Sequence, residues 1–111
     1  MEKEVKEIVW SKLAVSTLQI IYAYISEQSI KEAEKQIDRI FDRTESLAKG
    51  WIKIGQELDF KPGKLKFEYR YLVQDNYKII YHEQGKAIRI DIVFDTRQDP
   101  KKLKRLLGHV K

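Results

Sequence analysis

Residues 66–94, KFEYRYLVQDNYKIIYHEQGKAIRIDIVF, decide the fold class of this chain. Apolar and polar residues alternate with a period of two in three runs, which is the pattern of half-buried strands. Short turns separate the runs, one at Gln74 to Asn76 and one at Gln84 to Gly85. We therefore predict an antiparallel meander of three strands, over residues 66–73, 77–83 and 86–94.

A short strand and a helix are predicted ahead of the meander. Residues 5–10 alternate weakly and predict a strand that ends at Ser11. A serine can accept a hydrogen bond from an amide of the first helical turn, so a helix should run from Ser11 to about Glu27. Its apolar residues form two stripes, one of Ala14, Leu18, Ile21 and Ile25 and another of Leu13, Ile20 and Tyr24. Two stripes exceed what packing on one sheet requires, so we expect a second neighbour for this helix.

Only Gln28 and Ser29 separate this helix from the next, so the two should form an antiparallel hairpin. Ser29 and Glu32 have the spacing of a capping box, in which each side chain bonds a backbone amide. The second helix should end near Lys49, before Gly50. Its inner face is predicted to consist of Ala33, Ile37, Ile40, Thr44 and Leu47.

The remaining segments complete an α+β domain. Residues 51–65 are rich in glycine and proline and predict an irregular connection. After the meander, Asp99 and Pro100 have the pattern of an N-cap followed by a proline, which predicts a short basic helix ending at Gly108. No repeat or linker interrupts the chain, so residues 1–111 are expected to form one domain.

Composition excludes several classes of chemistry. The chain has no cysteine, which excludes disulfides and thiolate zinc sites. The longest apolar stretch, Leu18 to Ile25, is far shorter than the ~20 residues that span a bilayer, so we expect a soluble, cytoplasmic protein. No glycine-rich phosphate loop or HExxH pattern occurs, and His82 and His109 are far apart in sequence. We therefore expect no metal and no cofactor.

The net charge of +5 is unevenly distributed. Residues 1–50 hold 8 Lys or Arg against 9 Asp or Glu, whereas residues 51–111 hold 14 against 8. A basic half of this kind can attract nucleic acid or an acidic protein. Surplus lysine can also simply keep a small protein in solution.

The meander is expected to have one apolar and one polar face. The apolar face consists of tyrosine, isoleucine and phenylalanine residues, among them Tyr69 and Tyr71. If this face packs on the helices, the opposite face carries Arg70, Lys78, His82 and Arg89. This polar face could be solvated surface with cross-strand charge pairs. It could also bind nucleic acid or another target, extended by Arg97, Lys101 and Lys102.

Metal-free RNA cleavage is one chemistry that such a face could perform. The reaction needs cations for the developing phosphorane charge and groups that transfer protons. The candidate catalytic cations are Arg70, Lys78 and Arg97. His82 is the candidate acid or base, because an imidazole titrates near neutrality.

The order of elements resembles the RelE/ParE superfamily of type II toxin–antitoxin toxins, also called plasmid-stabilisation proteins. The resemblance is strongest in EYRYLVQDNYKIIY, residues 68–81, and in IVFDTRQDPKKL, residues 92–103, and is visible in VWSKLAVSTLQIIYAYI from Val9. It extends over about Val5 to Leu103. It implies a growth-inhibiting toxin that forms a hetero-oligomer with a cognate antitoxin, whose C-terminal segment wraps the helices and the sheet. Leu13, Ile20 and Tyr24 are the implied antitoxin contacts.

The superfamily implies one of two targets. RelE-like members cut mRNA in the ribosomal A site, and ParE-like members poison DNA gyrase. Lys78 stands where RelE-like toxins have a catalytic arginine, and Arg97 matches the arginine after the last strand. No tyrosine follows Arg97, where Leu103 and Leu106 stand instead, and His109 lies beyond the usual place. This departure favours the ParE-like branch over the RelE-like one, with an inactive binding module as a further alternative.

Overall fold

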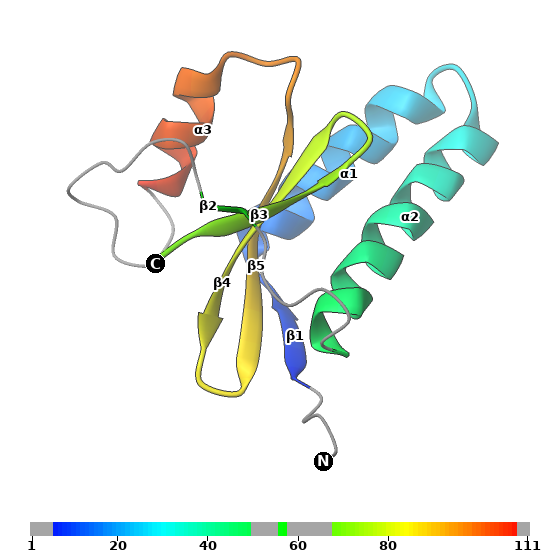
Figure 1. The fold of residues 1–111 in the computed structure, drawn as a ribbon. Helices are drawn as coiled ribbons and strands as arrows, with labels where there is room; N and C mark the ends of the chain where they lie inside the picture. The colour runs from blue at the N-terminus through cyan, green and yellow to red at the C-terminus, as the bar shows by residue number, and fades with distance from the viewer. Residues whose placement is uncertain (1–5, 50–55, 58–67, 109–111) are drawn as a thin grey trace.

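The computed structural model describes residues 6–49, 56–57 and 68–108, which form an α+β fold (Figure 1). Four features of the sequence prediction lie outside these ranges. They are the strand starts predicted at residues 5 and 66, the residue Gly50 after the second helix, and His109. The elements in chain order are β1 (Glu7–Trp10), α1 (Lys12–Ser26), α2 (Ile30–Ala48), β2 (Gln56–Glu57), β3 (Arg70–Gln74), β4 (Tyr77–Gln84), β5 (Ala87–Asp95) and α3 (Pro100–Leu107).

The strands form one sheet in the order β1-β5-β4-β3-β2. The predicted meander is confirmed, since β3 pairs with β4 and β4 pairs with β5, both antiparallel. β1 pairs with β5 in parallel, and β2 pairs with β3 in antiparallel. The irregular connection predicted for residues 51–65 is wrong at Gln56 and Glu57, because two residues are too short a run to show a period.

The helix hairpin is confirmed, with one correction at its turn. Ser11 caps α1 by accepting a hydrogen bond from the Ala14 amide at 3.0 Å, and Ser29 caps α2 by accepting from the Glu32 amide at 3.1 Å. The reciprocal half of the predicted capping box is wrong. The Ser29 amide donates to the Ile25 carbonyl oxygen at 3.0 Å, so it has no need of the glutamate side chain.

The hairpin covers one face of the sheet and makes the first core. The predicted inner residues of both helices are buried or half-buried there. They pack against Leu72 of β3 and alternate residues of β4, with Ile88, Ile90 and Val93 of β5. Burial of this apolar surface fixes the hairpin against the sheet.

A bulge in β5 changes which residues face the hairpin. Tyr81 is opposite Ile90, but the preceding residue Ile80 is opposite Ile92, so Asp91 is an extra residue. An extra residue reverses the alternation beyond it. Ile92 and Phe94 therefore face away from the hairpin, and the single apolar face predicted for the meander is wrong.

A second core occupies the other face of the sheet, beneath α3. The hairpin and α3 lie on opposite sides of the strands (Figure 1). Tyr69 and Tyr71 are buried, as predicted, but on the α3 side of the sheet. Leu72, the residue after Tyr71, faces the hairpin, so Tyr71 and Tyr69 face the opposite way. The second core consists of Tyr69, Tyr71, Ile80, Ile92, Phe94, Leu103 and Leu107, with Leu13 and Leu106 packed against it.

The start of α1 is hydrogen-bonded to the bulged part of β5. The Ser11 amide donates to the Ile90 carbonyl oxygen at 3.0 Å, and its hydroxyl donates to the Asp91 carbonyl oxygen at 2.9 Å. The Val93 amide donates to the Thr17 hydroxyl at 3.2 Å. β1 ends at Trp10, so α1 satisfies the backbone groups that β1 no longer reaches.

Replacing Thr17 with valine should destabilise the fold by about 1–3 kcal/mol. The exchange keeps the side-chain shape but leaves the Val93 amide as an unpaired donor beside the core. Urea denaturation measures the change in unfolding free energy. Thr17→Ser, which keeps the hydroxyl, is the control. Equal stability of the valine and serine variants would show that this bond contributes nothing.

Candidate functional site

The predicted polar residues of the meander do not share one face. Lys78 is opposite Phe94, and His82 is opposite Arg89, so all three polar residues lie on the α3 side of the sheet. Arg70 is opposite Tyr81, which belongs to the core beneath the hairpin. The prediction of a common face is therefore wrong for Arg70, whose side chain forms an ion pair with Glu68 at 3.5 Å.

His82 is buried rather than solvated, which corrects its predicted position. Its side chain is 2% exposed and that of Asp91 is 1% exposed. The two are joined by a hydrogen bond of 2.7 Å between His82 Nδ1 and Asp91 Oδ2. The bulge turns Asp91 toward the same face as His82, and this pairing lets a carboxyl occupy the interior.

Tyr69 completes this buried cluster, packing edge-on against the His82 ring with 5.7 Å between ring centroids. Burial raises the pKa of the Asp91 carboxyl, and the hydrogen bond with His82 opposes that rise. Burial, followed by the charge of Asp91, raises the pKa of Tyr69 to about 12. Tyr69 keeps its proton at neutral pH, and the side chains of Tyr69, His82 and Asp91 are all buried.

Lys78 and His82 are separated along β4. Four residues of strand place their Cα atoms roughly 13 Å apart, and His82 is buried whereas Lys78 is only half-buried. The Lys78 ammonium lies 4.4 Å from the centroid of the Tyr71 ring, a cation–π distance. Tyr71 is paired with Ile80, two residues farther from the β3–β4 turn than Lys78, so the ammonium extends along the sheet away from that turn.

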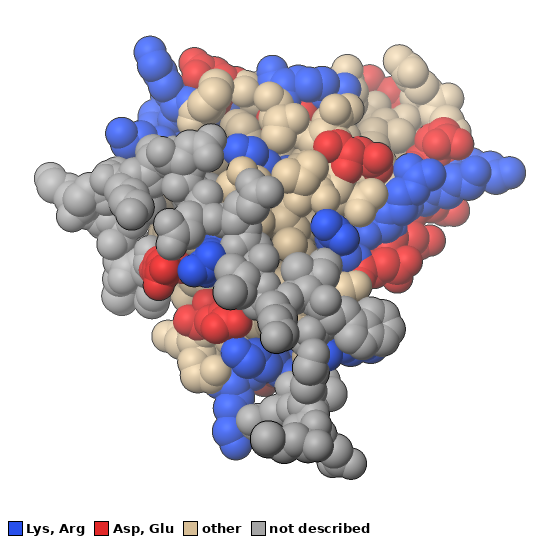
Figure 2. Space-filling model, in the orientation of Figure 1, with Lys and Arg blue, Asp and Glu red and all other residues tan. Residues whose placement is uncertain are grey.

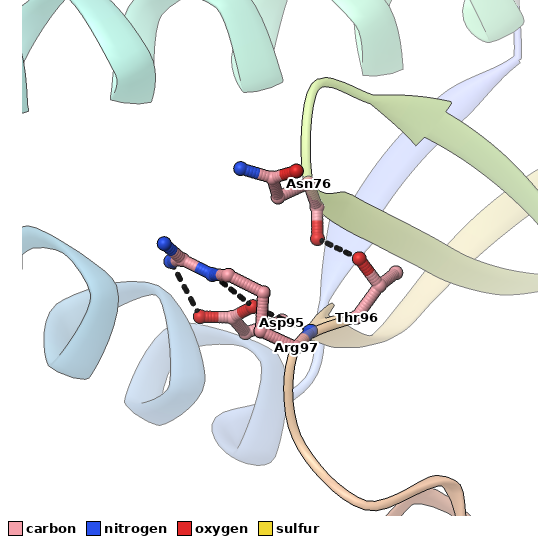
Figure 3. A network of polar contacts seen from close by, with 4 residues as sticks. All are labelled: Asn76, Asp95, Thr96 and Arg97. Carbon is pink, nitrogen blue, oxygen red and sulfur yellow. Dashed lines mark hydrogen bonds and ion pairs between the residues drawn. The ribbon is translucent and has the colours of Figure 1, made fainter.

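Arg97 is held in place by the turn that follows β5 (Figure 3). Its amide and Nε donate to Asp95 Oδ1, both at 2.9 Å, and a terminal guanidinium nitrogen donates to Oδ2 at 2.8 Å. Thr96 ties this turn to the β3–β4 turn, because its amide and hydroxyl donate to the Asn76 carbonyl oxygen at 2.8 and 2.7 Å. Two parallel bonds fix the guanidinium plane.

The guanidinium of Arg97 faces the helix hairpin. Its central carbon lies 5.9 Å from the centroid of the Tyr24 ring. Arg97 and Tyr24 line a cleft of about 290 Å³ between the hairpin tip and the β3–β4 turn, with Gln36 and Tyr77 among the other lining residues. Arg97 is therefore on the opposite side of the sheet from His82, although both were predicted to serve one site.

The remaining predicted residues lie on the helices. Lys101 and Lys102 are exposed on α3. Ile20 and Tyr24 are 65% and 62% exposed on α1. Leu13 is half-buried against the core beneath α3, so of the second stripe only this residue packs against an apolar core within the described chain.

The described part of the chain contains neither a metal-binding cluster nor a membrane-spanning helix. Residues 6–49, 56–57 and 68–108 contain no group of three His, Asp or Glu side chains that could hold a metal ion. Within the same ranges, no helix has the length and apolar character needed to cross a membrane.

Comparison with known proteins identifies the family. Residues 8–100 match the family model described as the ParE toxin of the type II toxin–antitoxin system, parDE. The chain belongs to the ParE toxin family. The match ends at Pro100, so nearly all of α3 lies beyond it.

A solved structure has the same fold as this ParE-family toxin. It is titled "Chromosomal ParDE TA system from P. aeruginosa", and it matches with a TM-score of 0.66 at 19% sequence identity. The alignment covers 84% of this chain and 98% of that chain. No curated protein sequence matches significantly.

Sequence reasoning missed the pairing of His82 with Asp91 and the role of Ser11 and Thr17 on β5. A signal was present in the apolar triplet from Ile92 to Phe94. A strand with three successive apolar residues is buried on both faces, whereas a half-buried strand alternates. That triplet excludes a wet sheet face at β5.

Replacing Arg97 with glutamine should raise the pKa of the Asp95 carboxyl toward its ordinary value. The Arg97 hydrogen bond now lowers that pKa, so the pair adds stability above pH 4 or so, and this stability is lost as the pH falls through the lowered pKa. Carboxyl carbon chemical shifts followed by NMR measure the titration. Arg39→Gln, near Asp75 at 3.7 Å, is the control and should leave Asp95 unchanged. An unchanged Asp95 titration in the Arg97 variant would contradict the assignment.

Proposed function

We propose that this ParE-family toxin inhibits growth by poisoning DNA gyrase in the cytoplasm and that a cognate antitoxin neutralises it. The match to the parDE toxin family over residues 8–100 carries the proposal, because ParE-like members of the superfamily poison gyrase. Poisoning requires binding but no catalytic group on the toxin. The geometry of the candidate catalytic residues supports this choice.

The residues predicted for RNA cleavage do not converge on one point. His82 and Tyr69 are 2% and 5% exposed, so neither presents its polar group at the surface of the sheet. Arg70 lies across the sheet from Lys78, and Arg97 faces the hairpin. A ribonuclease needs its acid, base and cations around a single phosphate. The dispersal of these groups favours gyrase over ribosome-bound mRNA.

Purified toxin should inhibit gyrase supercoiling and increase the amount of linear, gyrase-cleaved plasmid. A poison stabilises the cleaved enzyme–DNA complex, so both readouts should change together. Agarose gels after protease treatment measure them. Relaxation of the same plasmid by a type I topoisomerase is the control and should be unaffected.

Unchanged supercoiling at a large toxin excess would overturn the gyrase assignment. Primer extension on translated message, with the same protein preparation, tests the competing ribonuclease. Cuts inside codons that Arg97→Gln abolishes would favour that activity. Normal growth on expression without the antitoxin would favour an inactive binding module.

The antitoxin contact is assigned to the outer side of α1. Ile20 and Tyr24 are one helical turn apart and largely exposed, which suits the apolar face of a partner helix. Leu13 contributes less, because it packs against the core beneath α3. β1 is the edge strand beside β5 in the described sheet and can accept a partner strand.

The double variant Ile20→Asp, Tyr24→Asp should remain toxic but escape the antitoxin. Both side chains are exposed, so the fold tolerates the change, whereas carboxylates in an apolar contact are costly. Loss of two anchors should weaken binding roughly a thousandfold, at about 2 kcal/mol for each hot spot and about 1.4 kcal/mol for each factor of ten. Titration calorimetry against the product of the neighbouring reading frame measures the affinity.

The matched control is Val73→Asp, which places a carboxylate on an exposed apolar residue of β3. It should be neutralised like the natural toxin. Full neutralisation of the double variant would place the antitoxin contact elsewhere.

A further inference from the structure

The entire net charge of the chain is concentrated at its C-terminal end. Residues 96–111 hold six Lys or Arg and one Asp, whereas residues 1–95 hold sixteen side chains of each sign. Helix α3 contributes four of these cations, and all four are exposed. Lys and Arg side chains gather over α3 in the space-filling view (Figure 2). These four residues, called the α3 cations below, are Lys101, Lys102, Lys104 and Arg105.

The α3 cations are presented by a fixed scaffold. Leu103 and Leu107, on the inner side of the helix, are 4% and 1% exposed in the second core. Asp99 caps the helix, its side chain accepting a hydrogen bond from the Lys101 amide at 3.0 Å. A cation array on an anchored helix loses less backbone entropy on binding than a flexible tail would.

A hollow of about 610 Å³ lies along the cationic side of α3. Its described lining residues are Asp99, Lys101, Lys104 and Arg105. Positions three and four apart share one side of a helix, so Lys101, Lys104 and Arg105 project together. Within residues 6–49, 56–57 and 68–108, no ion pair joins Lys101, Lys102 or Arg105 to a carboxylate.

The outer side of α3 lacks the apolar anchors that protein partners use. Among the residues that the structure describes, the large exposed apolar side chains lie on α1, α2 and β3, and the leucines of α3 pack against the second core. Interfaces between proteins centre on buried aromatic and apolar anchors, whereas contacts to a phosphate backbone need only cations. Single-stranded nucleic acid would also require stacking aromatic residues, which α3 does not have.

We propose that the α3 cations bind the phosphate backbone of double-stranded DNA. With the proposed function, on which the consequence for gyrase rests, the toxin then contacts the DNA segment as well as the enzyme that cleaves it. The DNA contact is independent of sequence, because phosphates carry no base information. It raises the toxin concentration along DNA and is measurable without gyrase.

The test is binding of the full-length toxin to a fluorescein-labelled duplex of about 20 base pairs, followed by anisotropy over a salt series. The affected variant is Lys101→Gln, Lys102→Gln, Arg105→Gln. The matched control, Lys12→Gln, Lys31→Gln, Lys35→Gln, removes the same charge from exposed positions on the hairpin. Circular dichroism verifies that both variants are folded.

The α3 variant should bind the duplex on the order of a hundredfold more weakly at 0.1 M salt. Its plot of log affinity against log salt should be shallower by about 2.7, at 0.9 for each of three lost phosphate contacts. The control should keep the natural slope. Equal losses in both variants would reduce the effect to net charge and overturn the proposal, as would absence of binding by the natural toxin at low salt.

Gyrase assays with the same proteins separate this proposal from the proposed function. An α3 variant that loses duplex binding and poisons gyrase more weakly supports both. Duplex binding by a natural toxin that leaves gyrase unaffected supports the DNA contact and rejects the gyrase target. If the α3 variant instead loses binding to gyrase in the absence of DNA while keeping the duplex, the cations contact protein and the proposal is wrong.

Discussion

The hydrogen bonds between the first turns of α1 and the bulged part of β5 are the contact on which the remaining arrangement depends. A parallel strand, β1, pairs with β5 only as far as Trp10, and the chain then turns into a helix. Ser11 and Thr17 continue the edge by bonding the carbonyl oxygens and the amide that β1 leaves. The segment from Ser11 to Thr17 thus hydrogen-bonds the backbone groups of the bulge, caps α1 and orients the hairpin over the sheet. Without these partners, the extra residue at Asp91 would leave buried polar groups unpaired.

The bulge in turn explains how both faces of the sheet are buried. Ile88 and Ile90, before Asp91, face the hairpin, whereas Ile92 after it faces α3. The carboxyl of Asp91 enters the interior with a histidine as its partner. In a simple meander, the charged residues would share one solvated face. Here His82 is in the interior, and Arg70 and Lys78 lie on opposite sides of the sheet. Tyr24, Arg97 and the α3 cations remain exposed on the helices and turns around this doubly covered sheet.

Local signals in the sequence predicted the elements well, and for physical reasons. Caps at Ser11, Ser29 and Asp99 and the alternation around short turns act within a few residues, so they can be read without tertiary knowledge. The distribution of charged residues over the two faces could not be read in this way. A single extra residue at Asp91 changes the parity of a strand, and only the pairing register reveals it. Because the sequence alone does not give this register, it predicts Arg70 on the same face as Lys78 and predicts a solvent-exposed His82.

Burial of the central strand on two sides restricts how the chain can diverge during evolution. Every side chain from Ile79 to His82 is buried, alternating between the two cores. A substitution in this strand must fit the core on its own side of the sheet. It must also leave the strand in place, because the same strand supports the core on the other side. Selection can alter α3 and the outer side of α1 at far lower cost, because their exposed residues support neither layer. Changes in partner or target preference should accordingly accumulate on these two helices while the sheet between them stays nearly constant.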